Sequence, residues 1–315
     1  MDLPPPPPRT VERCYRHPAV ATGVHCTRCS RPICPDCMVP APVGHHCPTC
    51  VEEARREFRR GPGRRVRIVQ VRTVAATRAL LIALGAVYLL EVAVAGPGSL
   101  LAGPGSRSLI DLGGQIALAP SPDGPIGVAT GQYWRLLTAI FLHGGLLHLA
   151  MNAWVLWVIG GALERELGRW RFLAVFLTTG LFASAASYAL GDAVTALPGG
   201  GVAVAPVVSV GASGAIFGLF GTLVARDWRR RHLALANARL RQVLPWVVLN
   251  LALSFTFPVI DWRAHVGGLV AGLVAGTSID DARWSAPAAL VATLAATVAL
   301  TAWGTARIHA LVPGL

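Results

Sequence analysis

The sequence predicts an all-α polytopic membrane protein with a small metal-stabilised domain in front of its helices. Three observations predict this class. Hydrophobic residues make up 53% of the 315 residues and charged residues only 14%, which is too apolar for a soluble domain. Apolar segments of membrane-spanning character recur from residue 75 onwards. All seven cysteines lie between Cys14 and Cys50, outside these segments.

The net charge of +12 comes from arginine, since the chain contains no lysine. Together with abundant Ala, Gly and Pro, this indicates the coding bias of a GC-rich genome, so the charge predicts no nucleic-acid partner. Residues 1–12 contain the run Pro4 to Pro8 and are expected to form a disordered or polyproline tail.

Residues 13–51 contain four pairs of metal ligands, each pair separated by two residues. The pairs are Cys14 and His17, Cys26 and Cys29, Cys34 and Cys37, and Cys47 and Cys50. This spacing aims two side chains at one tetrahedral ion, and two pairs complete a zinc site. Short gaps favour interleaving, with pairs one and three on one ion and pairs two and four on the other. The pattern predicts two structural Zn²⁺ ions in a head that resembles a B-box or zinc ribbon. His45 and His46 are alternative ligands.

Residues 52–74 form a basic linker in which Glu52, Glu53 and Glu57 predict a short helix. Its arginines have two interpretations. They bind anionic lipid beside the first span, or they only fix the orientation of that span. Fixing the orientation is the least that these arginines are expected to do, and both interpretations can hold.

Seven apolar segments predict seven spans. They lie at about residues 75–95, 146–162, 172–191, 211–225, 243–257, 265–279 and 286–306. Several are shorter than the ~20 residues of an isolated span, which is tolerated where neighbouring helices shield their ends. Arginines crowd residues 55–78, 165–171 and 226–241, so the positive-inside rule predicts a cytoplasmic N-terminus. The cysteines then lie in a reducing compartment, which favours zinc over disulfides.

The loop from about residue 96 to 134 is unusually long and rich in Gly, Pro and Ser. It ends in the aromatic and basic cluster Gln132-Tyr133-Trp134-Arg135, which is expected to anchor the chain at the outer headgroup level.

Ser213 and His265 are the predicted nucleophile and base. Each stands at the outward end of a span, so the two lie at similar depth. Taken alone, a serine among glycines is a packing residue and a membrane histidine is a relay or structural partner. Glycines on both helices change this interpretation, because they permit the close approach that a Ser–His hydrogen bond requires. These glycines are Gly211, Gly214, Gly218 and Gly221 on one span and Gly268, Gly272 and Gly276 on the other.

His148 and Asn152 are spaced i, i+4 and therefore share a helix face. With the backbone N–H of Ser213, they would supply the donors that an acyl-transfer oxyanion needs. His143 is expected to anchor a loop. Phe217 packs either against the imidazole of His265 or in the ordinary core. Asp261 is expected to cap the helix of His265.

These motifs resemble the rhomboid family of intramembrane serine proteases. The resemblance rests on His148-x3-Asn152, Gly211-x-Ser213-Gly214, Ala264-His265 with Gly267 and Gly268, Trp134-Arg135, and Gly160-Gly161-x2-Glu164. It covers residues 75 to about 280. It implies a six-helix rhomboid core with a seventh C-terminal helix, so that residues 75–308 form the protease domain.

The resemblance further implies a Ser–His dyad without a carboxylate or a catalytic cofactor, with His148 and Asn152 as oxyanion donors. It implies cleavage of single-pass transmembrane proteins near the outer face of the bilayer. Phe217 stands where the family often has tyrosine, and the ring can still stack on the histidine. The head resembles those of some bacterial members, which places the chain in a bacterial plasma membrane.

Three other hypotheses compete. A catalytically silent rhomboid-like scaffold would bind or chaperone membrane proteins, but such proteins typically lose the serine or histidine. A transporter would need further buried carboxylates along a path, and the sequence shows none mid-span. The zinc head can also recruit a cytoplasmic partner, which is compatible with protease activity.

Overall fold

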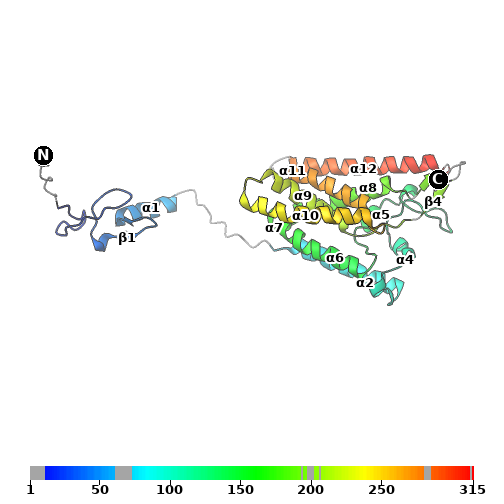
Figure 1. Cartoon of the computed structure of the whole chain (residues 1–315), viewed down its shortest axis with the longest axis horizontal. Coiled ribbons are helices and arrows are strands. Elements are labelled where there is room, and N and C mark those ends of the chain that lie inside the picture. Colours follow the sequence, from blue (N-terminus) through cyan, green and yellow to red (C-terminus); the bar gives the residue numbers. More distant parts are fainter. Residues whose placement is uncertain are drawn as a thin grey trace, which may run out of the picture. The chain divides into compact units, whose positions relative to one another are not determined.

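The computed structural model describes residues 11–60, 73–192, 194–196, 202–205, 207–279, 285–312 and 314–315. The chain forms two compact units, Met1–Gln70 and Val71–Leu315 (Figure 1). Nearly all of the predicted polyproline tail, and residues 61–72 of the basic linker, lie outside the described residues.

The N-terminal unit is built around its cysteines. It contains the 3₁₀ turn η1 (Pro35–Cys37), the antiparallel strands β1 (Val39–Pro40) and β2 (His45–His46), and helix α1 (Pro48–Arg60). Its buried cluster consists of six cysteines and Ile33. So small an apolar core cannot hold a fold of this size by itself, which is the usual setting for a structural metal. Helix α1 confirms the short helix predicted from the glutamates.

The second unit contains a helix at every predicted span. These are α2 (Ala75–Ala95), α6 (Leu146–Val155) continuing through the π turn η3 (Leu156–Gly160) into α7 (Gly161–Leu167), α8 (Arg169–Leu190), α9 (Ser213–Arg229), α10 (Ala234–Thr256), α11 (Trp262–Ser278) and α12 (Ser285–Leu311). Helix α10 starts at Ala234 rather than near residue 243, because arginine-rich turns continue a helix without adding to its hydropathy.

Within the described residues, four helical stretches combine the length and apolar composition of a membrane span. They are Ala75–Ala95, Leu146–Leu167, Arg169–Leu190 and Pro287–Leu311. Helices α9 and α11 have 17 residues each, as short as predicted. Most residues of α9 are buried by neighbouring helices, so this helix does not have to match the lipid thickness alone.

Helices α9 and α11 approach backbone to backbone. A Cβ added to Gly268 would lie 2.0 Å from the carbonyl oxygen of Gly214, and one added to Gly272 would lie 2.0 Å from that of Gly218. Only hydrogen atoms fit between the chains at these points. The predicted glycine faces therefore meet each other, and they set the distance between Ser213 and His265.

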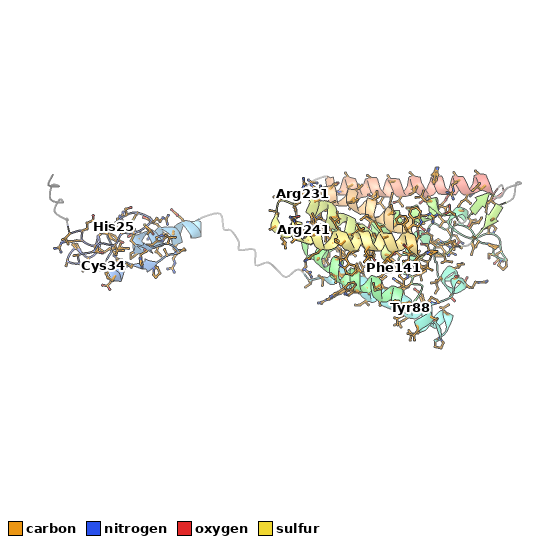
Figure 2. All side chains as sticks on the ribbon, in the orientation of Figure 1. His25, Cys34, Tyr88, Phe141, Arg231 and Arg241 are labelled. Atoms are coloured by element: carbon orange, nitrogen blue, oxygen red, sulfur yellow. The ribbon has the colours of Figure 1, made fainter. Side chains whose placement is uncertain are left out.

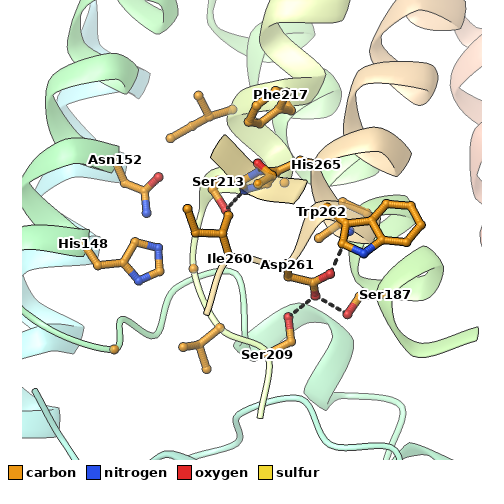
Figure 3. A pocket seen from close by; sticks show the side chains of 18 of the residues that line it. His148, Asn152, Ser187, Ser209, Ser213, Phe217, Ile260, Asp261, Trp262 and His265 are labelled. Atoms are coloured by element: carbon orange, nitrogen blue, oxygen red, sulfur yellow. Dashed lines mark hydrogen bonds between the residues drawn. The ribbon is translucent and has the colours of Figure 1, made fainter. Parts of the chain in front are cut away.

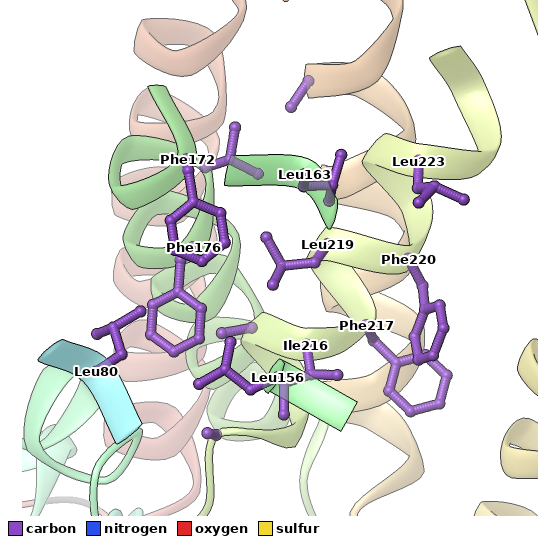
Figure 4. Packing of buried hydrophobic residues seen from close by; sticks show 14 of the residues in the cluster. Leu80, Leu156, Leu163, Phe172, Phe176, Ile216, Phe217, Leu219, Phe220 and Leu223 are labelled. Atoms are coloured by element: carbon purple, nitrogen blue, oxygen red, sulfur yellow. The ribbon is translucent and has the colours of Figure 1, made fainter. Parts of the chain in front are cut away.

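Apolar packing around α9 completes the core (Figure 4). Phe172 and Phe176 of α8, Leu156 of η3 and Leu219 of α9 are all fully buried. At the start of α2, the Glu164 carboxylate of α7 accepts hydrogen bonds from the backbone N–H groups of Ala76 (2.9 Å) and Thr77 (2.7 Å). Two helices far apart in sequence are thereby held together.

Arginines gather at one end of the helical unit, where Arg231 and Arg241 lie (Figure 2). Arg239 of α10 bridges the carboxylates of Asp227 and Glu166 there. The hydrogen bonds that this guanidinium donates to the carboxylates of Asp227 and Glu166 raise its pKa.

The long first loop contains α3 (Ser99–Ala102), α4 (Ser106–Asp111) and the 3₁₀ turn η2 (Val128–Thr130), and it ends in α5 (Arg135–Thr138). A second loop carries the antiparallel strands β3 (Val194–Ala196) and β4 (Val202–Val204).

The structure corrects the prediction for Arg135. Its side chain is buried and donates to the carbonyl oxygens of Ile110 (2.7 Å) and Gly114 (2.9 Å), whereas Tyr133 and Trp134 are half exposed. Burial lowers the pKa of this guanidinium. Arg135 ties the loop together because it reaches carbonyl oxygens on both sides of the turn after α4, so interfacial anchoring applies only to the two aromatic residues.

Candidate active site and metal centres

Ser213 is the first residue of α9, and its Oγ lies 2.8 Å from Nε2 of His265 on α11 (Figure 3). The turn before it needs glycine, since Gly211 has φ +125°, a conformation that side chains rarely adopt. The N–H of Gly211 donates to the carbonyl oxygen of Ala139 at 2.8 Å, which fixes this turn. The structure brings the two predicted residues into the geometry of a nucleophile and its base.

Phe217 lies one turn further along α9 and stacks on the imidazole of His265, with centroids 4.3 Å apart and an interplanar angle of 19°. Of the two predicted alternatives for this ring, packing against the base is therefore the one observed, although the ring also contributes to the core.

Asp261 caps α11, as predicted. Its Oδ1 accepts from the backbone N–H of Ala264 at 3.1 Å, and its Oδ2 accepts from the hydroxyl groups of Ser187 and Ser209. The carboxylate is thus engaged with three donors of the loops and helix ends around it.

A side chain that the sequence analysis missed lies on the other nitrogen of the base. Oγ of Ser254, on α10, is 2.6 Å from Nδ1 of His265. The available signal was a serine within the apolar segment 243–257, but such hydroxyls usually bond only to their own helix.

His148 and Asn152 face Ser213 from α6 (Figure 3). A Cβ on Gly211 would lie 2.7 Å from the His148 ring and 3.7 Å from Nδ2 of Asn152, so both side chains converge on the turn that precedes Ser213. Nδ2 of Asn152 is buried without a hydrogen-bond partner. An orphaned buried donor is uncommon and indicates a group that waits for a ligand.

His143 is fully buried, and its ring meets the His148 ring edge to face at 5.1 Å. Its backbone N–H donates to the carboxylate of Glu91 on α2 at 3.0 Å. Glu91 is a fully buried carboxylate that the sequence analysis did not consider, and it lies one turn before the end of α2 rather than mid-span. It holds the loop in front of α6, which agrees with the anchoring role expected for His143.

Ser213, His265, His148 and Asn152 line one cavity of about 1250 Å³. Trp154 of α6 and Trp246 of α10 also line it, and their half-exposed rings meet edge to face with centroids 6.2 Å apart. The cavity is large enough to hold several residues of an unwound peptide.

The N-terminal unit contains two candidate metal centres. Cys14, His17, Cys34 and Cys37 form one cluster, and Cys26, Cys29, Cys47 and Cys50 form the other, with all ligand atoms of a cluster within 4.8 Å of one another. This is the interleaved pairing that the spacing predicted. Neither cluster includes His45 or His46, which form β2.

The donor sets fit tetrahedral zinc. Zn–S bonds of ~2.3 Å place two sulfurs roughly 3.8 Å apart, and a Zn–N bond of ~2.0 Å places nitrogen and sulfur roughly 3.6 Å apart. Sγ of Cys29 and Cys47 are 3.7 Å apart, and Nδ1 of His17 lies 3.5 Å from Sγ of Cys37. Burial raises the pKa of the Cys37 and Cys50 thiols, and a bound cation would favour their deprotonated, ligating forms.

Comparison with known proteins identifies relatives of the helical unit. The model of the Rhomboid domain family matches residues 130–279. Rhomboid protease GluP of Bacillus subtilis (strain 168) is 36% identical over 151 residues, which cover 46% of this chain and 26% of that protein. The chain thus spans about a quarter of its length. RHOMBOID-like protein 5 of Arabidopsis thaliana is 38% identical over 151 residues, 46% of this chain and 43% of that protein.

A shorter relative is covered more fully. Putative rhomboid protease YdcA of Bacillus subtilis (strain 168) is 34% identical over 147 residues, which cover 47% of this chain and 67% of that protein. The helical architecture, the serine and histidine joined across two glycine-faced helices, and these matches lead to one conclusion. This chain belongs to the rhomboid family.

Proposed function

We propose that this chain is an intramembrane serine endopeptidase that cleaves single-pass transmembrane proteins near the outer face of the bilayer. The observation that carries the proposal is the 2.8 Å contact between Ser213 Oγ and His265 Nε2, beside an Asn152 amide that has no partner. The rhomboid proteases among its relatives support the same reaction class.

In the proposed reaction, Ser213 Oγ attacks the scissile carbonyl carbon while Nε2 of His265 takes the hydroxyl proton. Asn152, His148 and the backbone N–H of Ser213 donate to the oxyanion. The first N–H groups of a helix have no partner within it, and Ser213 opens α9. His265 next protonates the leaving amine as the C–N bond breaks. Water then hydrolyses the acyl-enzyme, with the same histidine acting as the base.

No carboxylate takes part in this scheme. Asp261 is engaged with Ser187, Ser209 and Ala264, so its charge is used to hold α11 and the neighbouring segments. The stacked ring of Phe217 restricts the imidazole instead.

The substrate is proposed to enter sideways between α6 and α10, where Trp154 and Trp246 meet at the cavity edge. The uneven distribution of arginines supports a cytoplasmic N-terminus, and the resemblance of the head to those of bacterial rhomboids supports a bacterial plasma membrane. Ser213 would then lie towards the outer face.

The head is proposed to bind two structural Zn²⁺ ions. Each cluster supplies four donors, which fill the tetrahedral coordination of one ion and leave no open position for catalysis. A cytoplasmic protein is the expected partner of the head, and no nucleic acid is expected.

A fluorophosphonate probe tests the nucleophile directly. Purified wild type, Ser213→Ala and His265→Ala are labelled in detergent, and cleavage of a single-pass substrate is followed in liposomes. Label and cleavage that are present in wild type and lost in both variants support the proposal. Folded wild type that neither labels nor cleaves would favour a catalytically silent scaffold, and label that persists in Ser213→Ala would mean another nucleophile.

A further inference from the structure

Ser254 stands between the base and its own helix. The side chain is 2% exposed, and its Oγ lies 2.6 Å from Nδ1 of His265 and 2.6 Å from the backbone carbonyl oxygen of Asn250. Both distances are short hydrogen bonds.

The number of available protons decides the direction of both bonds. A serine hydroxyl has one hydrogen to donate, and the carbonyl oxygen of Asn250 can only accept. The hydroxyl hydrogen therefore points to Asn250, and Oγ offers a lone pair to His265. Nδ1 must then carry the ring hydrogen and donate it to Ser254.

This assignment also determines the protonation state of Nε2, the other ring nitrogen of His265. A neutral imidazole has one N–H, so Nε2 presents its lone pair towards Ser213 Oγ, 2.8 Å away. That is the tautomer in which His265 can take the hydroxyl proton. The opposite tautomer would place an N–H against Ser213 and could not act as a base.

We propose that Ser254 is a positioning residue that selects the reactive tautomer of His265 and stabilises it when the ring becomes doubly protonated. The inference rests on the proposed protease function and deepens it. Ser254 contributes what a buried carboxylate contributes in a Ser–His–Asp triad, but as a neutral acceptor, which has a lower desolvation cost at membrane depth.

The nucleophile, the base and the acceptor come from α9, α11 and α10 in turn. Trp246 on α10 also borders the cavity. A displacement of α10 away from α11 would therefore break the Nδ1 hydrogen bond and let His265 adopt either tautomer. The position of α10 thus controls whether His265 can act as the base.

Kinetics with matched variants give the first test. Ser254→Ala should lower kcat about tenfold, the equivalent of one hydrogen bond, with KM changed less than about twofold. Thr256→Ala is the control, since Thr256 makes the same bond to the residue four positions back (Ala252, 2.9 Å) but is exposed. Ser254→Thr keeps the hydroxyl and should restore kcat to within about threefold. Equal kcat in wild type and Ser254→Ala would overturn the inference.

Ring ¹⁵N shifts of His265 provide a second test that needs no activity. In Ser213→Ala, which lacks the partner on Nε2, His265 should still carry its proton on Nδ1. In Ser213→Ala/Ser254→Ala, protonation should move towards Nε2. A proton on Nε2 in the Ser213→Ala protein, or no change in the double variant, contradicts the role of Ser254.

The two tests separate the two proposals. A wild type that neither labels nor cleaves while His265 has the predicted tautomer would refute the protease function and leave the Ser254 assignment standing. An active wild type with an unaffected Ser254→Ala variant would support the protease function and refute the role of Ser254. If Ser254→Ala fails to fold, the tautomer in Ser213→Ala and the kcat of Ser254→Thr still decide.

Discussion

At the scale of single residues, the unpartnered amide of Asn152 is the clearest sign of a ligand-binding role. Asn152→Ala should lower kcat by about 10²–10³-fold, the usual effect of losing one oxyanion donor. The midpoint of thermal unfolding should change little, because the amide nitrogen has no hydrogen bond to lose.

The matched control for this prediction is Asn250→Ala. Asn250 lines the same cavity, but its amide donates to the carbonyl of Trp246 at 2.8 Å on its own helix. Its kcat should stay within about threefold of wild type. A similar loss in both variants would mean that Asn152 acts through packing.

The sequence predicted those site residues whose role can be recognised from their spacing along the chain. Ser213 lies in a glycine turn, His148 and Asn152 share a helix face, and Asp261 precedes a helix. The contact of Ser254 with His265 could not be predicted in this way. It depends on where α10 crosses α11, and neither periodicity nor composition specifies that crossing.

At the scale of helices, the contact between α9 and α11 tolerates no side chain at its glycines. Gly272→Ala would force a Cβ to 2.0 Å from the Gly218 carbonyl oxygen, so α11 must shift. We expect destabilisation by about 1–3 kcal/mol and reduced fluorophosphonate labelling of Ser213. Thermal unfolding and labelling rates measure both effects.

Gly85→Ala on α2 is the matched control. A Cβ at Gly85 would meet no atom within 4 Å, so this variant should be neutral or up to about 1 kcal/mol more stable through helix propensity. Normal stability of Gly272→Ala would show that the two backbones are further apart than described.

Substitutions of Asp261, which caps α11, distinguish a structural role of this carboxylate from a catalytic one. Asp261→Asn keeps an oxygen for the Ala264 N–H and should retain most activity. Asp261→Ala loses all three hydrogen bonds and should melt at lower temperature. A loss of kcat of a hundredfold or more in Asp261→Asn, at unchanged stability, would instead make Asp261 a member of the catalytic group.

Helix positions were predicted more accurately than helix ends. The apolar segment 75–95 coincides with α2, whereas α10 begins at Ala234 and α7 continues to Leu167. Hydropathy detects the part of a helix that resembles lipid. The arginine-rich turns beyond it are also helical, but only hydrogen bonding shows this.

At the scale of the whole molecule, the two compact units are expected to lose their structure separately. Purified protein should contain two zinc ions per chain by elemental analysis. A strong chelator should unfold the head, since metal binding supplies its folding free energy. Fluorophosphonate labelling of Ser213 should persist, because its contacts lie within Val71–Leu315.

Single substitutions assign the ligands. Cys29→Ser should remove one zinc ion, while His45→Ala and His46→Ala should keep both, because neither histidine belongs to a cluster. Loss of zinc in a histidine variant would contradict the ligand sets described above.

The π turn η3 divides one continuous helix into two halves with separate tasks. Before it, His148 and Asn152 face Ser213, and after it, Glu164 holds the start of α2. Removing one residue from Leu156–Gly160 would turn one half against the other by about 100°. Within this segment, Leu156 is fully buried whereas the side chain of Trp157 is half exposed, so the identity of residue 157 matters little. In related sequences, the number of residues in this segment should therefore stay fixed and position 156 should stay apolar, while the residue at position 157 should vary.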